Sequence, residues 1–222
     1  MNVIKAIDER HSVRQYLIKK IDEDVVDKLS KFIDQINIES GLNIQLILNE
    51  PKSFDAFLSH YGKFEGVENY IALVGRKGDN LNEKLGYFGE KIVLYAQTLG
   101  LNTCWVALSY KKNKNIVKVN TGEKFVAVIA IGYGKTHGVE RKSKLINQVS
   151  NADSNSPEWF INGVKCALKA PTALNQQKFY FTQKNNVVNV KRGIGFYTLM
   201  DLGIVKLHFE LGAGLDNFIW EK

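Results

Sequence analysis

Two continuous apolar runs, residues 103–108 and 125–131, constrain the fold of this chain most. Both follow a segment, residues 86–100, whose apolar side chains recur at helical spacing and which ends in glycine, a natural helix stop. Uninterrupted apolar runs of this length are typical of strands that are buried on both faces. We therefore expect a helix followed by two buried strands.

Shorter patterns on either side continue this alternation of helices and strands. An opening helix is expected to end near Glu9, and a second helix is expected between an N-cap at Asp22 and Gly41. Two strands are expected next, at 44–48 and 70–74. A helix that runs to about residue 168 is expected to open with Ser156 as its cap and Pro157 at its first position. A hairpin of 178–183 and 187–191 and a last helix at 197–212 complete the expected elements.

A polar, turn-forming linker at residues 151–155 divides the chain into a first half, residues 1–150, and a second half, residues 151–222. The halves share a pattern, because Ile-Val and Leu-Gly pairs at 92–100 recur with identical spacing at 204–212. Each of these helices is expected to follow a helix and two strands in its own half. An internal duplication explains the match, and chance similarity between apolar helices that end in glycine is the alternative.

Composition and charge narrow the class of protein only slightly. The 45% of hydrophobic and 24% of charged residues are typical of a globular domain, and the net charge of +7 permits an anionic partner without identifying one. No apolar run approaches the length of a membrane span, and charged residues interrupt the start, so we expect a cytoplasmic protein without membrane contact. The two cysteines, Cys104 and Cys166, are expected to be reduced and buried.

Motifs for most kinds of side-chain catalysis are missing. The sequence has no His-Glu-x-x-His pattern, no cysteine pair at metal spacing and no Gly-x-Ser-x-Gly elbow. The segment 132–135, Gly-Tyr-Gly-Lys, follows an expected strand but lacks the third glycine of a dinucleotide loop, which favours a simple turn. We therefore expect neither a metal ligand nor a catalytic side chain.

Two polar segments are candidates for binding a ligand. Arg10, Ser12 and Arg14 follow the opening helix, and two guanidinium groups with a hydroxyl can surround a phosphate. The segment 170–177, Ala-Pro-Thr-Ala-Leu-Asn-Gln-Gln, offers donors and acceptors that suit the polar edge of a flat heterocycle. Taken singly, the first segment is better explained as surface arginines and the second as a helix-to-strand connection.

Together with two further segments, they resemble the nitroreductase family. Residues 10–16, Arg-His-Ser-Val-Arg-Gln-Tyr, are similar to the family's opening arginine-x-serine-x-arginine/lysine motif, and residues 170–177 resemble its alanine-proline-serine motif. Residues 100–105, Gly-Leu-Asn-Thr-Cys-Trp, resemble the family's glycine-leucine-x-threonine-cysteine-tryptophan stretch. The glycine-tyrosine and basic stretches within residues 132–149 resemble the family's closing segment. Thr172 replaces the usual serine, and Lys178-Phe179 replaces the common proline-tryptophan.

The resemblance implies an α+β, nitroreductase-like fold with a mostly antiparallel sheet flanked by helices and with two pseudo-repeated halves. In the family, a dimer binds FMN at its interface, and the proline-serine loop comes from the opposite subunit. In this chain the corresponding loop lies after the linker. The resemblance therefore implies a branch that carries both contributors in one polypeptide, binds one FMN, and is a monomer (a pseudo-dimer) or a homodimer.

The same resemblance assigns the FMN contacts to both halves. Arg10 and Ser12 would bind the phosphate, with Arg141 as a further cation, and Arg14 would lie near N1 and O2 of the ring, where positive charge stabilises the reduced cofactor. The other implied contacts, which line the ring or the ribityl chain, are Ala107, Leu108, Pro171, Thr172, Ala173 and Asn175.

The implied activity is that of an FMN-dependent NAD(P)H oxidoreductase, which reduces small acceptors of the nitroaromatic or quinone type by ping-pong hydride transfer. Because the cofactor supplies the chemistry, no acid or base from the protein is needed. One alternative is a protein that binds or senses flavin without efficient turnover. Another is a basic nucleic-acid-binding domain, whose affinity would fall steeply with salt. The first interpretation predicts NAD(P)H and a small acceptor as partners, and no nucleic acid.

Overall fold

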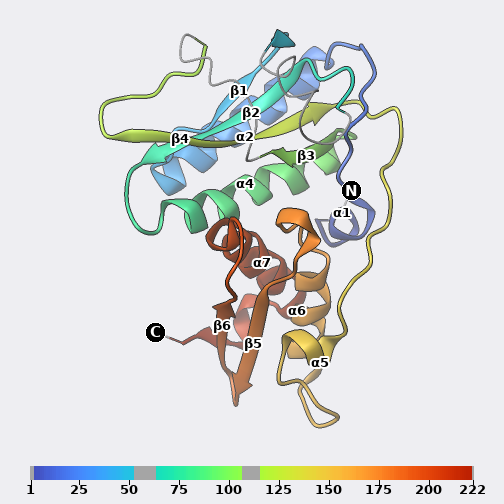
Figure 1. Ribbon diagram of the computed structural model, residues 1–222, viewed down its shortest axis with the longest axis vertical. Coiled ribbons are helices and arrows are strands. Elements are labelled where there is room, and N and C mark those ends of the chain that lie inside the picture. Colours follow the sequence, from blue (N-terminus) through green and yellow to red (C-terminus); the bar gives the residue numbers. More distant parts are fainter. Residues whose placement is uncertain (1–2, 53–63, 107–115, 222) are drawn as a thin grey trace. The chain divides into compact units, whose positions relative to one another are not determined.

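The computed structural model describes residues 3–52, 64–106 and 116–221 (Figure 1). The chain forms two compact units. Unit 1 consists of Met1–Leu81 and Ile92–Glu140, and unit 2 of Asn82–Lys91 and Arg141–Lys222. The polar linker expected at 151–155 lies within unit 2. Most of the expected first half therefore forms unit 1, while 82–91 and 141–150 belong to unit 2.

Unit 1 contains a four-stranded antiparallel sheet with the order β1-β2-β4-β3. Its strands are β1 (Gln45–Ile47), β2 (Asn69–Arg76), β3 (Asn102–Val106) and β4 (Glu123–Gly132). The central pair β2 and β4 runs from Asn69 opposite Ile131 to Arg76 opposite Glu123. Both strands are almost entirely buried, which confirms the prediction for the run 125–131. Of the other run, 103–108, the described part lies in β3 and is mostly buried, and residues 107–108 lie outside the described residues.

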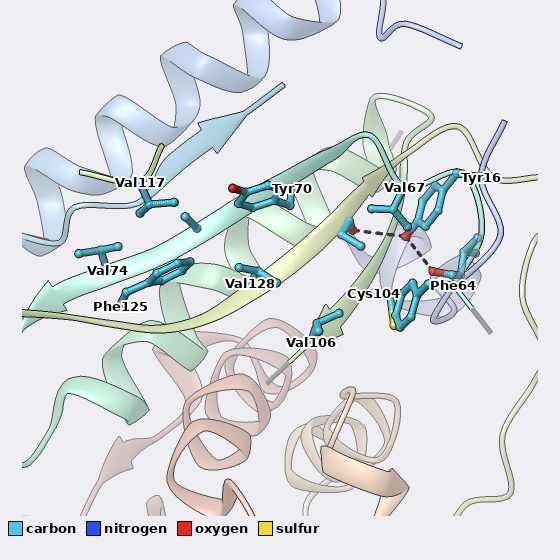
Figure 2. Packing of buried hydrophobic residues seen from close by; sticks show 13 residues of the cluster. Tyr16, Phe64, Val67, Tyr70, Val74, Cys104, Val106, Val117, Phe125 and Val128 are labelled. Carbon is cyan, nitrogen blue, oxygen red and sulfur yellow. Dashed lines mark hydrogen bonds between the residues drawn. The ribbon is translucent and has the colours of Figure 1, made fainter. Parts of the chain in front are cut away.

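One side of this sheet carries the hydrophobic core that Figure 2 shows. Tyr70 of β2, Cys104 of β3 and Val128 of β4 lie in this core because side chains alternate between the two faces of a strand. Tyr16, which precedes the sheet in sequence, belongs to the same core, and its hydroxyl donates hydrogen bonds to the carbonyl oxygens of Val13 (2.7 Å) and Ala130 (3.4 Å). The segment that follows the opening helix is therefore anchored in the core.

The helices of unit 1 begin and end close to the predicted positions. Helix α1 is Val3–Glu9, and α2 is Glu23–Ser40 with Asp22 at its N-cap and Gly41 in the left-handed conformation at its end. Helix α4 is Leu81–Thr98, so it begins before residue 86, where the sequence pattern placed its start. Its second part packs on α2, because the rings of Phe32 and Tyr95 stack at 4.2 Å.

Unit 2 combines a helical pair with a small sheet. Helices α6 (Glu158–Leu168) and α7 (Thr198–Ala213) pack on each other, and an aromatic cluster includes Phe209, which stacks on Phe181 at 4.6 Å. The sheet has the order β5-β6-β7, antiparallel in the first pair and parallel in the second. The remaining elements are α5 (Ile146–Val149), η1 (Ala173–Asn175), β5 (Phe179–Lys184), β6 (Val187–Arg192), η2 (Leu215–Asn217) and β7 (Ile219–Trp220).

Three details of the sequence prediction need correction. Pro157 occupies the N-cap of α6 and not its first helical position, and the Ser156 hydroxyl interacts with Asp153 instead of capping the helix. Cys166 is partly exposed, whereas Cys104 is buried as expected, and neither forms a disulfide bond. Within the described residues, no helix has the length and apolarity to cross a membrane.

Candidate functional site

In unit 1, the arginine-serine segment, residues 10–16, is held by backbone hydrogen bonds on both sides. The amide of Val13 donates to the carbonyl of Thr103 in β3 at 3.0 Å, and the amide of Tyr16 donates to the carbonyl of Glu65 at 2.9 Å. The next amide, that of Leu17, donates to the carbonyl of Tyr133 at 2.8 Å. The segment is therefore a fixed extended strand beside the sheet, even though it lies outside the four sheet strands.

The side chains of this segment differ in burial. Val13 and Tyr16 enter the core and are each 1% exposed, whereas Ser12 is half-buried and Arg14 is exposed. Arg10, at the end of α1, is only 2% exposed. Arginine is rarely buried to this extent, so the interpretation of this residue as an ordinary surface arginine is wrong.

The two arginines and the serine all interact with one group of β3, the thiol of Cys104. Burial raises the pKa of this thiol, while the charges of Arg14 and Arg10 and a hydrogen bond with Ser12 act in the opposite direction without cancelling the effect. The thiol is therefore neutral at pH 7. Ser12 is hydrogen-bonded to the thiol and the charges of both guanidinium groups act on it, so the three side chains belong to the same neighbourhood of unit 1. Their donors are of the kind that suits a phosphate.

In unit 2, the proline-threonine loop, residues 170–177, connects α6 to β5 in a backbone conformation that needs support. Leu174 and Asn175 have φ of 53° and Gln177 has φ of 44°, in the left-handed region. This region costs a residue with a side chain about 1–2 kcal/mol. Three such residues in four positions are stable only if other contacts hold the loop in place.

The buried amide of Gln177 provides one set of these contacts. Its side chain is 1% exposed, and its Nε2 donates to the carbonyl of Leu168 at 2.9 Å. Its Oε1 accepts a hydrogen bond from the amide of Lys144 at 2.8 Å, and its own backbone amide donates to Oγ1 of Thr172 at 3.1 Å. Gln177 therefore joins the end of α6, the loop and the basic segment.

The basic segment, residues 141–144, makes further hydrogen bonds to the loop. The guanidinium of Arg141 donates to the carbonyls of Ala170 at 3.1 Å and Lys169 at 2.6 Å, where α6 ends. Nδ2 of Asn175 donates to the carbonyl of Lys142 at 2.8 Å. The basic segment and the proline-threonine loop, both recognised from their sequences, thus form one hydrogen-bonded body.

Asp201 in the first turn of α7 completes the support and was missed by sequence reasoning. Its Oδ1 accepts a hydrogen bond from the amide of Ala173 at 3.0 Å, and its Oδ2 accepts one from Nε2 of Gln176 at 2.8 Å. Burial raises the pKa of this carboxyl to about 6, although both hydrogen bonds act to lower it. A signal was available in the sequence, because Asp201 is the one acid among the apolar residues 199–205.

The predicted contact residues therefore fall into two sets. Arg10, Ser12 and Arg14 come together in unit 1. The set in unit 2 consists of Arg141, Pro171, Thr172, Ala173 and Asn175. The two remaining predicted contacts, Ala107 and Leu108, lie outside the described residues. The role of each residue toward FMN stays a prediction.

Comparisons with known proteins identify the family of the chain. A family model described as "Putative TM nitroreductase" matches residues 2–213. A nitroreductase structure from Thermotoga maritima is similar with a TM-score of 0.70 and 26% identity, over 96% of this chain and 83% of that one. A search of the curated proteins finds no match.

Two more distant structures share the fold. One is an FMN-dependent nitroreductase from Clostridium difficile, with a TM-score of 0.51 and 19% identity over 69% of this chain and 99% of that one. The other is a nitroreductase-like protein from Bacillus cereus, with a TM-score of 0.52 and 18% identity over 67% of this chain and 94% of that one. Because the family model matches residues 2–213, which is nearly the whole sequence, this chain belongs to the nitroreductase family.

Proposed function

We propose that this protein is an FMN-dependent NAD(P)H oxidoreductase that reduces small acceptors such as nitroaromatics and quinones. The observation that carries the proposal is the convergence of Arg10, Ser12 and Arg14 on one place beside β3. A buried arginine next to a hydroxyl suits a dianionic phosphate, which is the most strongly charged part of FMN, and Arg14 adds a second positive charge in the same neighbourhood. Membership in the nitroreductase family supports the same cofactor.

In unit 1, Arg10 and Ser12 would bind the FMN phosphate, and Arg14 would place a positive charge at the edge of the ring. Bound FMN would supply the hydride chemistry between NAD(P)H and the acceptor, in a ping-pong scheme. The task of the protein is then to bind and orient the cofactor and to tune its reduction. A fixed positive charge favours a ligand that becomes more negative on reduction, which is the role that we propose for Arg14.

In unit 2, Pro171, Thr172, Ala173 and Asn175 would contact the same cofactor, with Arg141 as an additional cation. Oγ1 of Thr172 accepts a hydrogen bond from Gln177, so the hydroxyl hydrogen can be donated to a ligand. Nδ2 of Asn175 uses one hydrogen for Lys142, which leaves Oδ1 and the second amide hydrogen for the polar edge of a heterocycle.

A duplication within the chain would explain why both sets of contacts occur in one polypeptide. The order of the described elements supports it, because α2, β1, β2 and α4 in one part and α6, β5, β6 and α7 in the other are each a helix, an antiparallel strand pair and a helix. The strands that follow differ between the two parts. We expect the protein to be a monomer that binds one FMN. A solution mass that corresponds to an obligate dimer would contradict the monomer.

The first test is the identity of the cofactor and the effect of the arginine-serine segment on its affinity. We expect purified protein to release FMN on denaturation. Ser12→Ala and Arg14→Met should each weaken FMN binding about 10- to 100-fold, since a hydrogen bond to a charged group contributes about 1.5–3 kcal/mol. Arg76→Met, at the exposed end of β2, is the matched control and should bind as the unchanged protein does. Equal affinities for all four proteins would refute the proposed contacts of Ser12 with the phosphate and of Arg14 with the ring.

Turnover distinguishes the enzyme from a protein that binds or senses flavin. We expect NAD(P)H to bleach the bound cofactor without oxygen, at a rate at least equal to steady-state turnover. Double-reciprocal plots at several acceptor concentrations should be parallel. Slow bleaching with intact binding would favour the sensing function, and intersecting lines would exclude the ping-pong scheme.

A further inference from the structure

The proline-threonine loop depends on contacts that come from a different element, helix α7. Leu174 and Asn175 both have φ of 53°, and they stand directly between Ala173 and Gln176, the two residues that bind Asp201. The two hydrogen bonds therefore hold both ends of the left-handed turn. Without them, only the contacts of Asn175 and Gln177 oppose relaxation of the turn toward the ordinary right-handed or extended regions.

Gln176 extends this support to a second segment. Its Nε2 donates to Oδ2 of Asp201 at 2.8 Å and also to the carbonyl of Phe196 at 2.6 Å. The turn between β6 and α7, which contains Phe196, is thus connected to the loop through the same amide. Asp201 is 7% exposed, so its two hydrogen bonds do not compete with bulk water.

We propose that Asp201 is a positioning residue, whose carboxylate holds the proline-threonine loop in the conformation that binds the cofactor. This inference rests on the proposed function, since the loop carries Thr172 and Asn175. A carboxylate suits this position because both of its oxygens are acceptors, and they face two donors. An amide or a neutral carboxyl has the same shape but turns one N–H or O–H toward a donor, so that one of the two contacts is lost.

The protonation state of Asp201 should therefore control the loop. Its pKa is raised to about 6, with burial as the main cause. Two charged groups on the adjoining segments bind elsewhere, because Arg192 donates to Thr198 and Lys178 donates to the carbonyl of Ile194. The described residues give Asp201 no ion pair. Below about pH 6, the neutral carboxyl loses one contact and the loop should open more often.

Hydrogen exchange in the flavin-free protein tests the contact directly. We expect Asp201→Asn to accelerate exchange of the amides of residues 173–177 about tenfold at pH 7.5, while amides of α6 keep their rates. Asp216→Asn is the matched control, because Asp216 is an exposed acid of the same unit. Unchanged exchange at Ala173 in Asp201→Asn would overturn the proposal, whether or not the protein binds FMN.

The pH profile separates a positioning role from general support of the helix. After correction for the intrinsic rate of exchange, the loop amides of the unchanged protein should exchange faster below pH 6, and those of Asp201→Asn should show no such step. The profile is read without flavin, because a phosphate monoester also titrates near pH 6. A step that persists in Asp201→Asn would assign the transition to another group and overturn the proposal.

Cofactor affinity tests whether the loop geometry matters for function. Asp201→Asn should weaken FMN binding about tenfold at pH 7.5. Gln176→Met removes one of the two hydrogen bonds without altering α7, and it should weaken binding in the same direction. Faster exchange with unchanged FMN affinity would overturn the positioning role. If the unchanged protein binds no FMN, the proposed function fails, and the exchange data alone decide whether Asp201 holds the loop.

Discussion

Asp201 shows how one side chain can lower stability and support a binding loop at the same time. Its carboxyl has a pKa of about 6 in the folded protein, against 3.8 for an unperturbed aspartate. Between these values the folded state binds more protons than the unfolded state does, so stability falls as pH rises through this window. Above pH 6 the charged form costs up to about 3 kcal/mol, because each unit of pKa corresponds to about 1.4 kcal/mol.

This cost predicts the pH dependence of the Asp201→Asn variant. The amide has no charge to bury, so the free energy of unfolding of the variant, relative to that of the unchanged protein, should rise by about 2–3 kcal/mol from pH 4 to pH 7.5. Urea unfolding of both proteins at the two pH values measures the difference. Asp216→Asn should show no such trend. A relative stability that does not change with pH would mean that Asp201 is not perturbed as described.

At the scale of single elements, sequence periodicity predicted most helices and strands but not their exact ends or the shortest pieces. The buried strands β2 and β4 were predictable because their apolar runs are long. Strand β7 has two residues, which is too short for any period, and its parallel pairing with β6 joins distant positions. The start of α4 was predicted too late because its glycines, Gly86 and Gly89, resemble helix boundaries.

The glycines of these helices have a packing role that the sequence pattern does not reveal. In unit 2, a Cβ on Gly203 of α7 would overlap the carbonyl oxygen of Glu83, and a Cβ on Gly86 would overlap that of Met200. The backbones of α7 and of the first turns of α4 therefore approach each other closely at these two positions. Alanine has the higher helix propensity, by about 1 kcal/mol, so the close approach explains why glycine stands there.

Replacing one of these glycines should reverse the usual effect of alanine in a helix. Gly203→Ala should lower the free energy of unfolding by about 1–3 kcal/mol, because two backbones must move apart. Gly78→Ala is the control, since a Cβ there meets only Asn80 Oδ1 at 3.8 Å, and it should change stability by less than about 0.5 kcal/mol. Thermal or urea unfolding measures both. A stabilised Gly203→Ala protein would show that the helices do not meet as described.

At the scale of the whole molecule, the sequence indicated both sets of contact residues but not what holds them. Arg10, Ser12 and Thr172 stand out because short motifs preserve their local spacing. The hydrogen bonds that hold the loop in unit 2, such as those of Gln177 with Lys144 and of Asp201 with Ala173, join different elements over distances in sequence that no local pattern encodes. The proposed site thus depends on two hydrogen-bonded bodies, one in each unit, that are built independently.

If both bodies serve one cofactor, changes in either unit should affect the same binding event. We expect titration to give one FMN per chain, and both Ser12→Ala and Asn175→Gly to weaken that single site at least tenfold. Glycine is the suitable replacement at Asn175, because it adopts the φ of 53° without strain, so the loss reports on the amide and not on the backbone. Asn147→Gly, an exposed residue of unit 2, is the control. Two FMN per chain, or unchanged affinity in either variant, would separate the arginine-serine segment from the loop and leave each to a different ligand.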